Sequence, residues 1–552
     1  YNNSYDIQQE NFLNYRNTFG NHSFAMFAGM QIQDYRRENF DIGANFLNDY
    51  VQTFNNYDPL IFTINSSTMN SENSNFSTFA GFNYDFKGKY LVSGTYRRDG
   101  SSRFGANNKY GNFPSGSIGW KVNKESFFKV KSISNLMLKA SFGVVGNERI
   151  ADYDFTGPYE IGSTYNGLGG IAPKRLGNDE LRWEKTTSTN IGLDLGMFNN
   201  RLTFNFDVWR KVTTDLLASV PLPEESGFSS IRKNVGSVNN EGFDLDISGT
   251  IIKKKNFTWN SSFNISFQRN EVTKLDGGTP FEVGQYRIEE GQSIGNIFGY
   301  KNLGVYQYNE SNAYTNDGVR LTPNFDANGA FVNYTLNGVV YTDLVRKMRT
   351  PNTVMQGGDI IWEDLNGDFT ITAADRQIIG NGLPKYFGGF TNDFKYKGFS
   401  LSFLFDYNLG QDIYRRWDEL RNDLNSNGET PGPDRIEGAW VKPGDVTVYP
   451  RLIRTNVPQN QFTPNSFFVT KGDYIKLRYI KVEYNFSKDV LNKLNFIKRM
   501  SLNLAVNNVL TWTNYIGYNP ELGNRGNALT PGLDNLRYPN DREIILGLKI
   551  QL

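Results

Sequence analysis

The most specific metal-ligand spacing in the sequence lies in the stretch DLNGDFTITAAD, residues 364–375. Oxygen-bearing side chains occupy positions 1, 3, 5, 7 and 12 of an EF-hand-like loop: Asp364, Asn366, Asp368, Thr370 and Asp375. Oxygen donors at this spacing suit Ca²⁺, but Phe369 stands where a glycine permits the sharp turn, and Asp375 is shorter than the usual glutamate. The stretch therefore predicts either a calcium site or a plain Asx-rich turn.

A serine in Gly291-Gln292-Ser293-Ile294-Gly295 matches the G-x-S-x-G pattern of a hydrolase nucleophile elbow. The triad histidine of such enzymes follows the serine in the chain. His22 is the sole histidine of this sequence, and it precedes Ser293. We therefore predict no catalytic residues, and a structural turn at Ser293.

Two further stretches, 300–314 and 417–440, are rich in aromatic and asparagine residues. Aromatic rings could stack on sugars or grip peptides, and they could equally form an interface with another protein. Both interpretations stay open.

The composition favours β-structure for the elements that position these residues. The chain has 42 Phe, 31 Tyr, 8 Trp and 54 Gly, and aromatic residues favour strands. Apolar runs do not reach the roughly 20 residues that a membrane-spanning helix requires. Zero Cys excludes disulfides and thiolate metal sites, and a net charge of +1 gives no electrostatic case for nucleic acid.

Apolar and polar residues alternate with a period of two in paired segments, which is typical of hairpins with one buried face. We expect one face to meet lipid in a single band: Phe82, Tyr84, Val92, Phe204, Phe206, Leu245, Ile247, Phe263, Ile265, Leu401, Phe403, Leu546 and Leu548. Their neighbours should face a polar lumen: Asn83, Asn205, Asp207, Asp244, Asp246, Ser400 and Ser402. Very short turns at Gly88, Asn200 and Gly398 alternate with long polar connections, which favours a membrane barrel over a soluble all-β protein.

Nine stretches, in order along the chain, resemble the SusC/RagA family of TonB-linked outer-membrane proteins of the Bacteroidetes. They include NVGSVNNEGFDLDI (234–247) and GDIIWEDLNGD (358–368). The other seven are residues 90–120, 138–148, 180–202, 290–307, 471–486, 507–521 and the closing strand 544–552. Only Leu552 departs from the aromatic residue that usually ends such barrels.

The resemblance implies an all-β fold, an antiparallel transmembrane β-barrel of the roughly 22-stranded TonB-dependent transporter type. We expect residues 1–552 to form the C-terminal part of one barrel domain with roughly fifteen of its strands, embedded in the outer membrane. The N-terminal plug and the segment that contacts the TonB complex are expected upstream of this chain.

The resemblance also implies TonB-dependent import of a bulky nutrient, an oligosaccharide or a peptide, with a SusD-like lipoprotein as a lid. Two other functions remain open: a structural subunit of a larger outer-membrane assembly, and a soluble all-β carbohydrate-binding protein. We expect long extracellular loops near residues 270–383 and 408–470, too long and too polar to pack as ordinary connections, to contact a partner.

Overall fold

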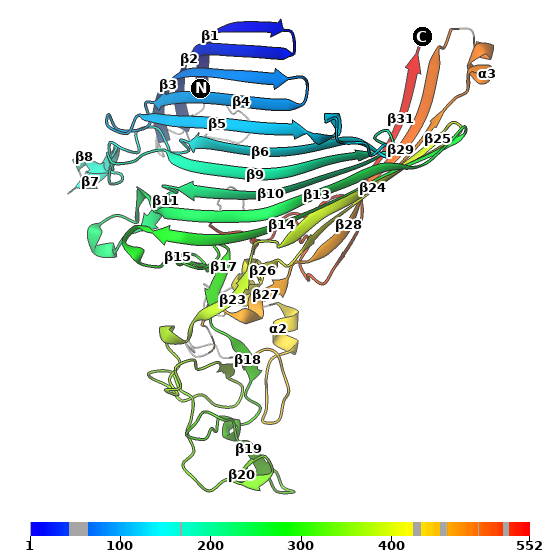
Figure 1. The fold of residues 1–552 in the computed structure, drawn as a ribbon. Helices are drawn as coiled ribbons and strands as arrows, with labels where there is room; N and C mark the ends of the chain where they lie inside the picture. Colours follow the sequence, from blue (N-terminus) through cyan, green and yellow to red (C-terminus); the bar gives the residue numbers. More distant parts are fainter. Residues whose placement is uncertain are drawn as a thin grey trace, which may run out of the picture. The chain divides into compact units, whose positions relative to one another are not determined.

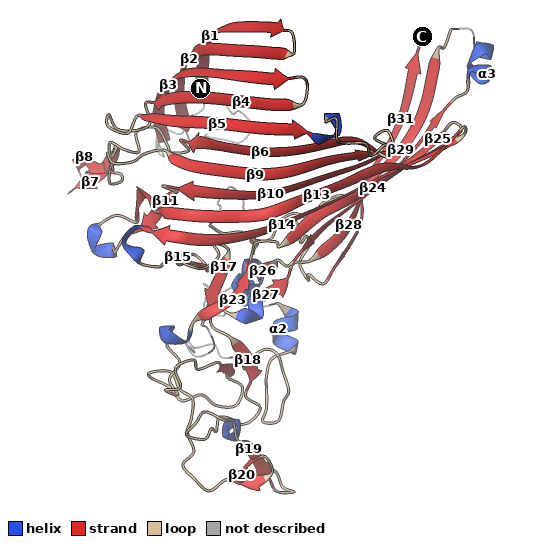
Figure 2. Ribbon diagram, viewed as in Figure 1, coloured by secondary structure: helices blue, strands red, loops and turns tan. Residues whose placement is uncertain are grey.

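The computed structural model describes residues 2–43, 65–165, 168–422, 432–452, 460, 462–494, 496–522 and 529–552. The chain divides into two units, residues 1–247 with 272–279, and residues 248–271 with 280–552. Antiparallel strands dominate both units, and the few helices are short and lie in connections (Figures 1 and 2). Among the described residues, no helix is long and apolar enough to cross a membrane.

Fifteen strands form one sheet, in which neighbours follow the order of the chain. The first nine are β1 (Asn2–Phe19), β2 (His22–Gly43), β3 (Asn65–Phe86), β4 (Tyr90–Ser101), β5 (Tyr110–Lys121), β6 (Ile133–Asn147), β9 (Glu184–Met197), β10 (Leu202–Thr214) and β13 (Gly236–Lys254). The remaining six are β14 (Phe257–Leu275), β24 (Tyr386–Tyr396), β25 (Phe399–Leu409), β28 (Tyr474–Asn485), β29 (Arg499–Thr513) and β31 (Glu543–Gln551). The expectation of roughly fifteen strands is confirmed.

Short and long connections alternate along this sheet. Every other connection is short: residues 20–21, 87–89, 122–132, 198–201, 255–256, 397–398 and 486–498. Among the remaining connections, only the described residues 102–109 between β4 and β5 are comparably short. The described longer ones include residues 148–183, 215–235, 276–385, 410–473 and 514–542. Lys87 and Gly88 have φ values of 60° and 61°, the left-handed backbone that matches a tight hairpin turn to the strand twist.

Small sheets and helices occupy the long connections. Their strands are β7 (Tyr159–Tyr165), β8 (Leu168–Pro173), β11 (Leu217–Pro221), β12 (Ser230–Asn234), β15 (Phe281–Val283), β16 (Tyr286–Ile288), β17 (Asn296–Gly299), β18 (Asn302–Val305), β19 (Thr322–Phe325), β20 (Phe331–Leu336), β21 (Val339–Val340), β22 (Ile360–Trp362), β23 (Gln377–Asn381), β26 (Asp412–Arg415), β27 (Val469–Lys471) and β30 (Leu533–Asp534). The α-helices are α1 (Arg416–Asn422), α2 (Pro433–Glu437) and, in a short connection, α3 (Lys488–Leu491).

In the first unit, the strand registers gather the apolar side chains on one face of the sheet. Val92 lies opposite Ile118, which lies opposite Ala140; Ala140 faces Ile191, and Ile191 faces Val208. Directly opposed residues share a face, so these registers extend one apolar face across five strands. The registers of β3 and β10 place Phe82, Tyr84, Phe204 and Phe206 on this apolar face. The Phe206 ring contacts the Phe243 ring of β13, so Leu245 and Ile247, which alternate with the same period as Phe243, lie on it too.

The opposite face of the first unit is polar and carries paired charges. Lys139 Nζ lies 2.8 Å from Asp194 Oδ1 and 3.3 Å from Asp207 Oδ2. Asn190 Nδ2 donates to Asp207 Oδ1 at 3.1 Å. The Lys139 charge is therefore balanced by two carboxylates on this face.

In the second unit, the expected apolar residues also share one face. Leu401 lies opposite Val482, Val482 opposite Leu504, and Leu504 opposite Leu546. The same registers put these residues of the expected set on that face: Phe263, Ile265, Phe403 and Leu548. Ser402 lies on the other face, where its hydroxyl donates to Asp393.

An arginine on the apolar face should destabilise the protein, whereas its neighbour on the polar face should tolerate one. Ile191 is 66% exposed near the middle of β9, so Ile191→Arg should cost about 2–4 kcal/mol in a bilayer. Asn190→Arg would meet Asp194 and Asp207, and we expect a loss below about 1 kcal/mol. Guanidinium unfolding of the full-length protein in lipid vesicles measures both, and equal losses would contradict the assignment of the two faces.

Candidate functional site

Three long connections of the second unit pack into one body, which we call the loop body: residues 280–385, 410–473 and 514–542, in their described parts. Tyr286, Tyr414 and Phe468 come from the first two connections and lie in one buried cluster, and the partly buried Leu533 of the third connection packs against it. The Tyr286 hydroxyl donates to the Pro531 carbonyl at 2.5 Å, and β26 pairs with β30 in parallel. The three connections therefore share a core instead of standing apart.

Two glycines permit the backbones of these connections to approach closely. A Cβ at position 382 would lie 2.0 Å from the carbonyl oxygen of Pro531, and one at position 299 would lie 2.1 Å from that of Pro464. No side chain fits at such distances, so the packing of the loop body requires glycine at both positions.

The aromatic stretch 300–314 supplies the interior of the loop body. Tyr300, Tyr306 and Tyr314 lie in a buried cluster with Trp362 and Ile371. The Tyr306 and Tyr314 hydroxyls are 2.7 Å apart, and burial raises the pKa of Tyr306 well above its usual value. These tyrosines are thus core residues, whereas ligand stacking or a protein interface would need them on the surface.

Residues 270–383 and 408–470, expected to be too long and too polar to pack as ordinary connections, form a core of their own in their described parts, and their contact with a partner stays a prediction. Asp359 shows how a charged side chain is accommodated in this core, since it is fully buried. Its carboxylate accepts from Arg451 Nε and from Asn460 Nδ2, both at 2.8 Å. Such contacts let a polar connection form a core, because a buried charge with partners costs far less than one without them.

An ionic cluster joins the loop body to the sheet at the start of β28. Glu521 pairs with both Lys476 and Arg478, and Arg478 also pairs with Asp406 at 2.6 Å. Burial alone would raise the pKa of Glu521, but hydrogen bonds from the two cations outweigh it and hold this pKa below the usual value. The ordered connection 514–522 is therefore fixed by charge as well as by packing.

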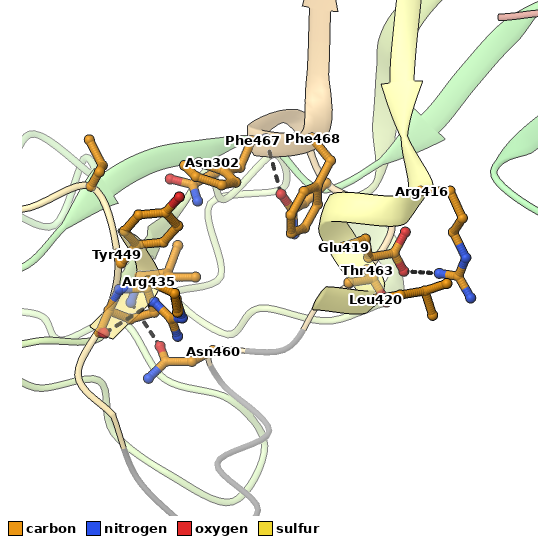
Figure 3. Close-up of a pocket in the computed structure, with 14 residues that line it drawn as sticks. Asn302, Arg416, Glu419, Leu420, Arg435, Tyr449, Asn460, Thr463, Phe467 and Phe468 are labelled. Atoms are coloured by element: carbon orange, nitrogen blue, oxygen red, sulfur yellow. Dashed lines mark hydrogen bonds and ion pairs between the residues drawn. The ribbon is translucent and has the colours of Figure 1, made fainter. Parts of the chain in front are cut away.

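A cavity of about 290 Å³ lies within the loop body (Figure 3). Arg416 and Glu419 of its wall form an ion pair. The Arg435 side chain is 5% exposed; its Nη1 donates to the Pro450 carbonyl at 3.3 Å, and its guanidinium lies 5.2 Å from the Tyr449 ring centre. Burial lowers the pKa of Arg435 to about 10. Sequence reasoning missed this residue, because nothing in the surrounding sequence marks an arginine as buried.

The Asp/Asn-rich loop is held by hydrogen bonds to its own backbone. Asp364 accepts from the amides of Gly367 at 2.9 Å and Phe369 at 2.8 Å, and Asp368 accepts from Thr370 at 2.7 Å. Asp375 is fully buried and accepts from the amides of Leu365 and Thr372. Asn366 Nδ2 donates to Asp368 Oδ2 at 2.9 Å. Asp364, Asn366, Asp368, Thr370 and Asp375 thus belong to one compact turn.

Phe369 stands where an EF-hand-like loop has a glycine, but it does not prevent the sharp turn in the structure. Phe369 adopts a φ of 64°, the left-handed backbone that a glycine would supply. Arg349 pairs with the loop on both sides of Thr370, since its amide donates to Phe369 and its carbonyl accepts from Ile371. Within the described parts of the chain, no three His, Cys, Asp or Glu side chains gather as a metal site, and calcium binding stays a prediction.

Ser293 lies in a turn, where its Oγ accepts from the Gly295 amide at 3.4 Å. His22 begins β2, and its Nδ1 lies 2.7 Å from the Tyr84 hydroxyl. Each residue therefore has a local structural role.

An antiparallel sheet with one apolar and one polar face, alternating short and long connections, and a large loop body defines the wall of an outer-membrane β-barrel. A family model described as TonB dependent receptor-like, beta-barrel matches residues 1–372, and the chain belongs to this family. The family consists of receptors and transporters of the outer membrane, which are not enzymes.

Individual proteins agree with this assignment. The chain is 50% identical to TonB-dependent receptor P39 of Formosa agariphila over 552 residues, 99% of this chain and 53% of the relative. It is 28% identical to TonB-dependent receptor SusC of Bacteroides thetaiotaomicron, over 100% of this chain and 50% of that protein. The chain spans about half the length of these relatives. A structure of the RagAB peptide transporter has a similar fold, with a TM-score of 0.77, 24% identity, and coverage of 100% of this chain and 56% of that one.

If the Asp/Asn-rich loop binds calcium, titration of the full-length protein should release or absorb heat and raise the melting temperature. Asp364→Asn should weaken this response, because it removes one anionic oxygen ligand from a site that depends on ligand charge. Asp326→Asn, in another turn of the loop body, is the matched control. A wild-type protein without calcium heat would leave the loop as an Asx turn.

Replacing Glu521 should destabilise the protein in a pH-dependent manner. Lys476 is 2% exposed, so Glu521→Gln leaves a buried cation without its partner and should cost about 3 kcal/mol at neutral pH. The pKa of Glu521 is lowered in the fold, so its contribution is present above the ordinary pKa of about 4.3 and is lost as the pH falls through the lowered value. The difference between wild type and variant should therefore shrink below about pH 4.

Chemical denaturation at a series of pH values measures this difference. Glu289→Gln removes the same charge from the more exposed pair with Arg287 and should cost less than about 1 kcal/mol. A pH-independent effect of Glu521→Gln would contradict the ionic role.

Proposed function

We propose that the full-length protein imports a bulky nutrient, an oligosaccharide or a peptide, across the outer membrane with energy from the TonB complex. The observation that carries the proposal is the two-faced sheet. Its apolar face suits lipid, whereas its other face carries paired charges that suit a water-filled passage. Similarity to SusC and to the RagAB peptide transporter supports the same function.

We further propose that a SusD-like lipoprotein docks on the loop body from the extracellular side. The support is an exposed apolar tip formed by β19–β21 and the segment after it, which lies far from the long strands of its unit (Figure 1). Val332, Val339, Val340 and Leu344 are 52–71% exposed there. Exposed apolar patches of this kind mark protein interaction sites, and a stable complex should bury more than about 1,000 Å².

Uptake by intact cells tests the import proposal. A strain without the gene should lose uptake of the nutrient, and a chromosomal copy without the TonB-contacting segment should not restore it. If that copy restores full function, the protein serves as a structural subunit of an outer-membrane assembly.

Charge on the apolar tip should weaken docking of the lipoprotein without unfolding the barrel. Val340→Glu places a carboxylate where we expect apolar contact and should reduce co-purification at least about tenfold, the effect of a roughly 1.4 kcal/mol loss. Val130→Glu, in a short connection, is the control and should leave co-purification unchanged. Quantitative mass spectrometry of detergent-purified complexes measures the ratio, and an unchanged ratio for Val340→Glu would exclude the tip as the docking surface.

A further inference from the structure

The cavity of the loop body contains a buried guanidinium without a compensating charge. Among the described residues, no carboxylate pairs with Arg435, and its Nε lacks any hydrogen-bond partner. Nearby charges are already paired: Arg421 with Asp434, and Arg415 with Asp418. An isolated buried charge is costly, so proteins normally provide it with a partner.

The remaining cavity wall combines neutral polar groups with apolar side chains. The ion pair of Arg416 and Glu419 contributes no net charge, so the cavity is positive by one unit through Arg435. Asn302, Thr463 and Asn465 offer neutral hydrogen-bonding groups, and apolar surface comes from Leu420, Val448 and Phe467. A volume of about 290 Å³ is at the lower limit of small-molecule sites, enough for one residue or one sugar ring but not for a whole bulky nutrient.

We propose that this cavity binds a carboxylate group, with Arg435 as its charged partner. A guanidinium matches a carboxylate in both charge and planar donor geometry, and no carboxylate of the described residues takes this place. Two sources have this chemistry: the carboxyl terminus of a peptide and the carboxylate of a uronic acid. The site concerns binding alone and holds whether or not the protein imports its ligand.

A purely structural arginine would give a different result on substitution. The hydrogen bond from Arg435 to Pro450 is long, at 3.3 Å, and the face of the Tyr449 ring offers weaker stabilisation of the cation than a carboxylate would. Arg435→Gln removes the uncompensated charge, so the unliganded protein should melt at the same temperature as wild type or higher. A clear drop in melting temperature, or a failure to fold, would show that Arg435 supports the structure and would overturn the proposal.

Calorimetry on the detergent-purified full-length wild type tests the ligand directly. N-acetyl-L-leucine is compared with N-acetyl-L-leucinamide, and D-glucuronate with D-glucose, so each pair differs chiefly in the carboxylate. At least one acid should bind about tenfold or more tightly than its neutral analogue, the size expected of a charge-assisted pair. The acid that binds identifies the source, and binding of both means that the carboxylate itself is recognised.

Two variants complete the test. Arg435→Gln should abolish the preference for the acid, whereas Arg421→Gln, in the neighbouring helix, should keep it. The proposal is overturned if neither acid binds, if the neutral analogues bind equally well, or if the preference survives Arg435→Gln.

Discussion

The structure depends on one constraint, the need to pair every backbone N–H and C=O while one side of each strand meets hydrocarbon. A continuous antiparallel ladder satisfies the backbone, and the period of two then separates the side chains into an apolar and a polar set. Val92, Ile118 and Ile191 follow this rule from strand to strand. The polar set has to neutralise its own charges, as Lys139 does with Asp194 and Asp207.

The long connections are free of that constraint and obey the rules of a water-soluble domain. Their core is built from tyrosines, a buried ion pair at Asp359 and Arg451, and backbones that meet at Gly299 and Gly382. Three connections far apart in the sequence thereby become one body. The ion pairs of Glu521 with Lys476 and Arg478 attach that body to the sheet.

Period-two alternation and turn residues predicted part of the strands, and they placed the apolar residues of those strands on a common face, because both signals are local. The loop body was not predictable in the same way. Its tyrosines between residues 300 and 314 have the composition of a binding surface, and only the contacts with Trp362 and Ile371 show that they are buried. At position 369 the sequence favours a glycine, because the sharp turn needs a positive φ. Phe369 adopts that φ in the structure, where its carbonyl accepts a hydrogen bond from the Arg349 amide. The sequence gives no sign that Arg435 is buried, since the residues that cover it lie elsewhere in the chain.

The distribution of charge differs between the sheet and the loop body. On the polar face of the sheet, Lys139, Arg478 and Lys481 each lie beside a carboxylate. In the loop body, the buried Arg435 has no carboxylate partner among the described residues. A paired charge interacts weakly with a ligand because its field is already screened, whereas a desolvated, unpaired charge retains its full interaction energy for an incoming anion. If the protein imports a nutrient as proposed, the described polar face of the sheet would offer a passing solute no unpaired anchor of this kind, and Arg435 of the loop body would be the group that selects a carboxylate.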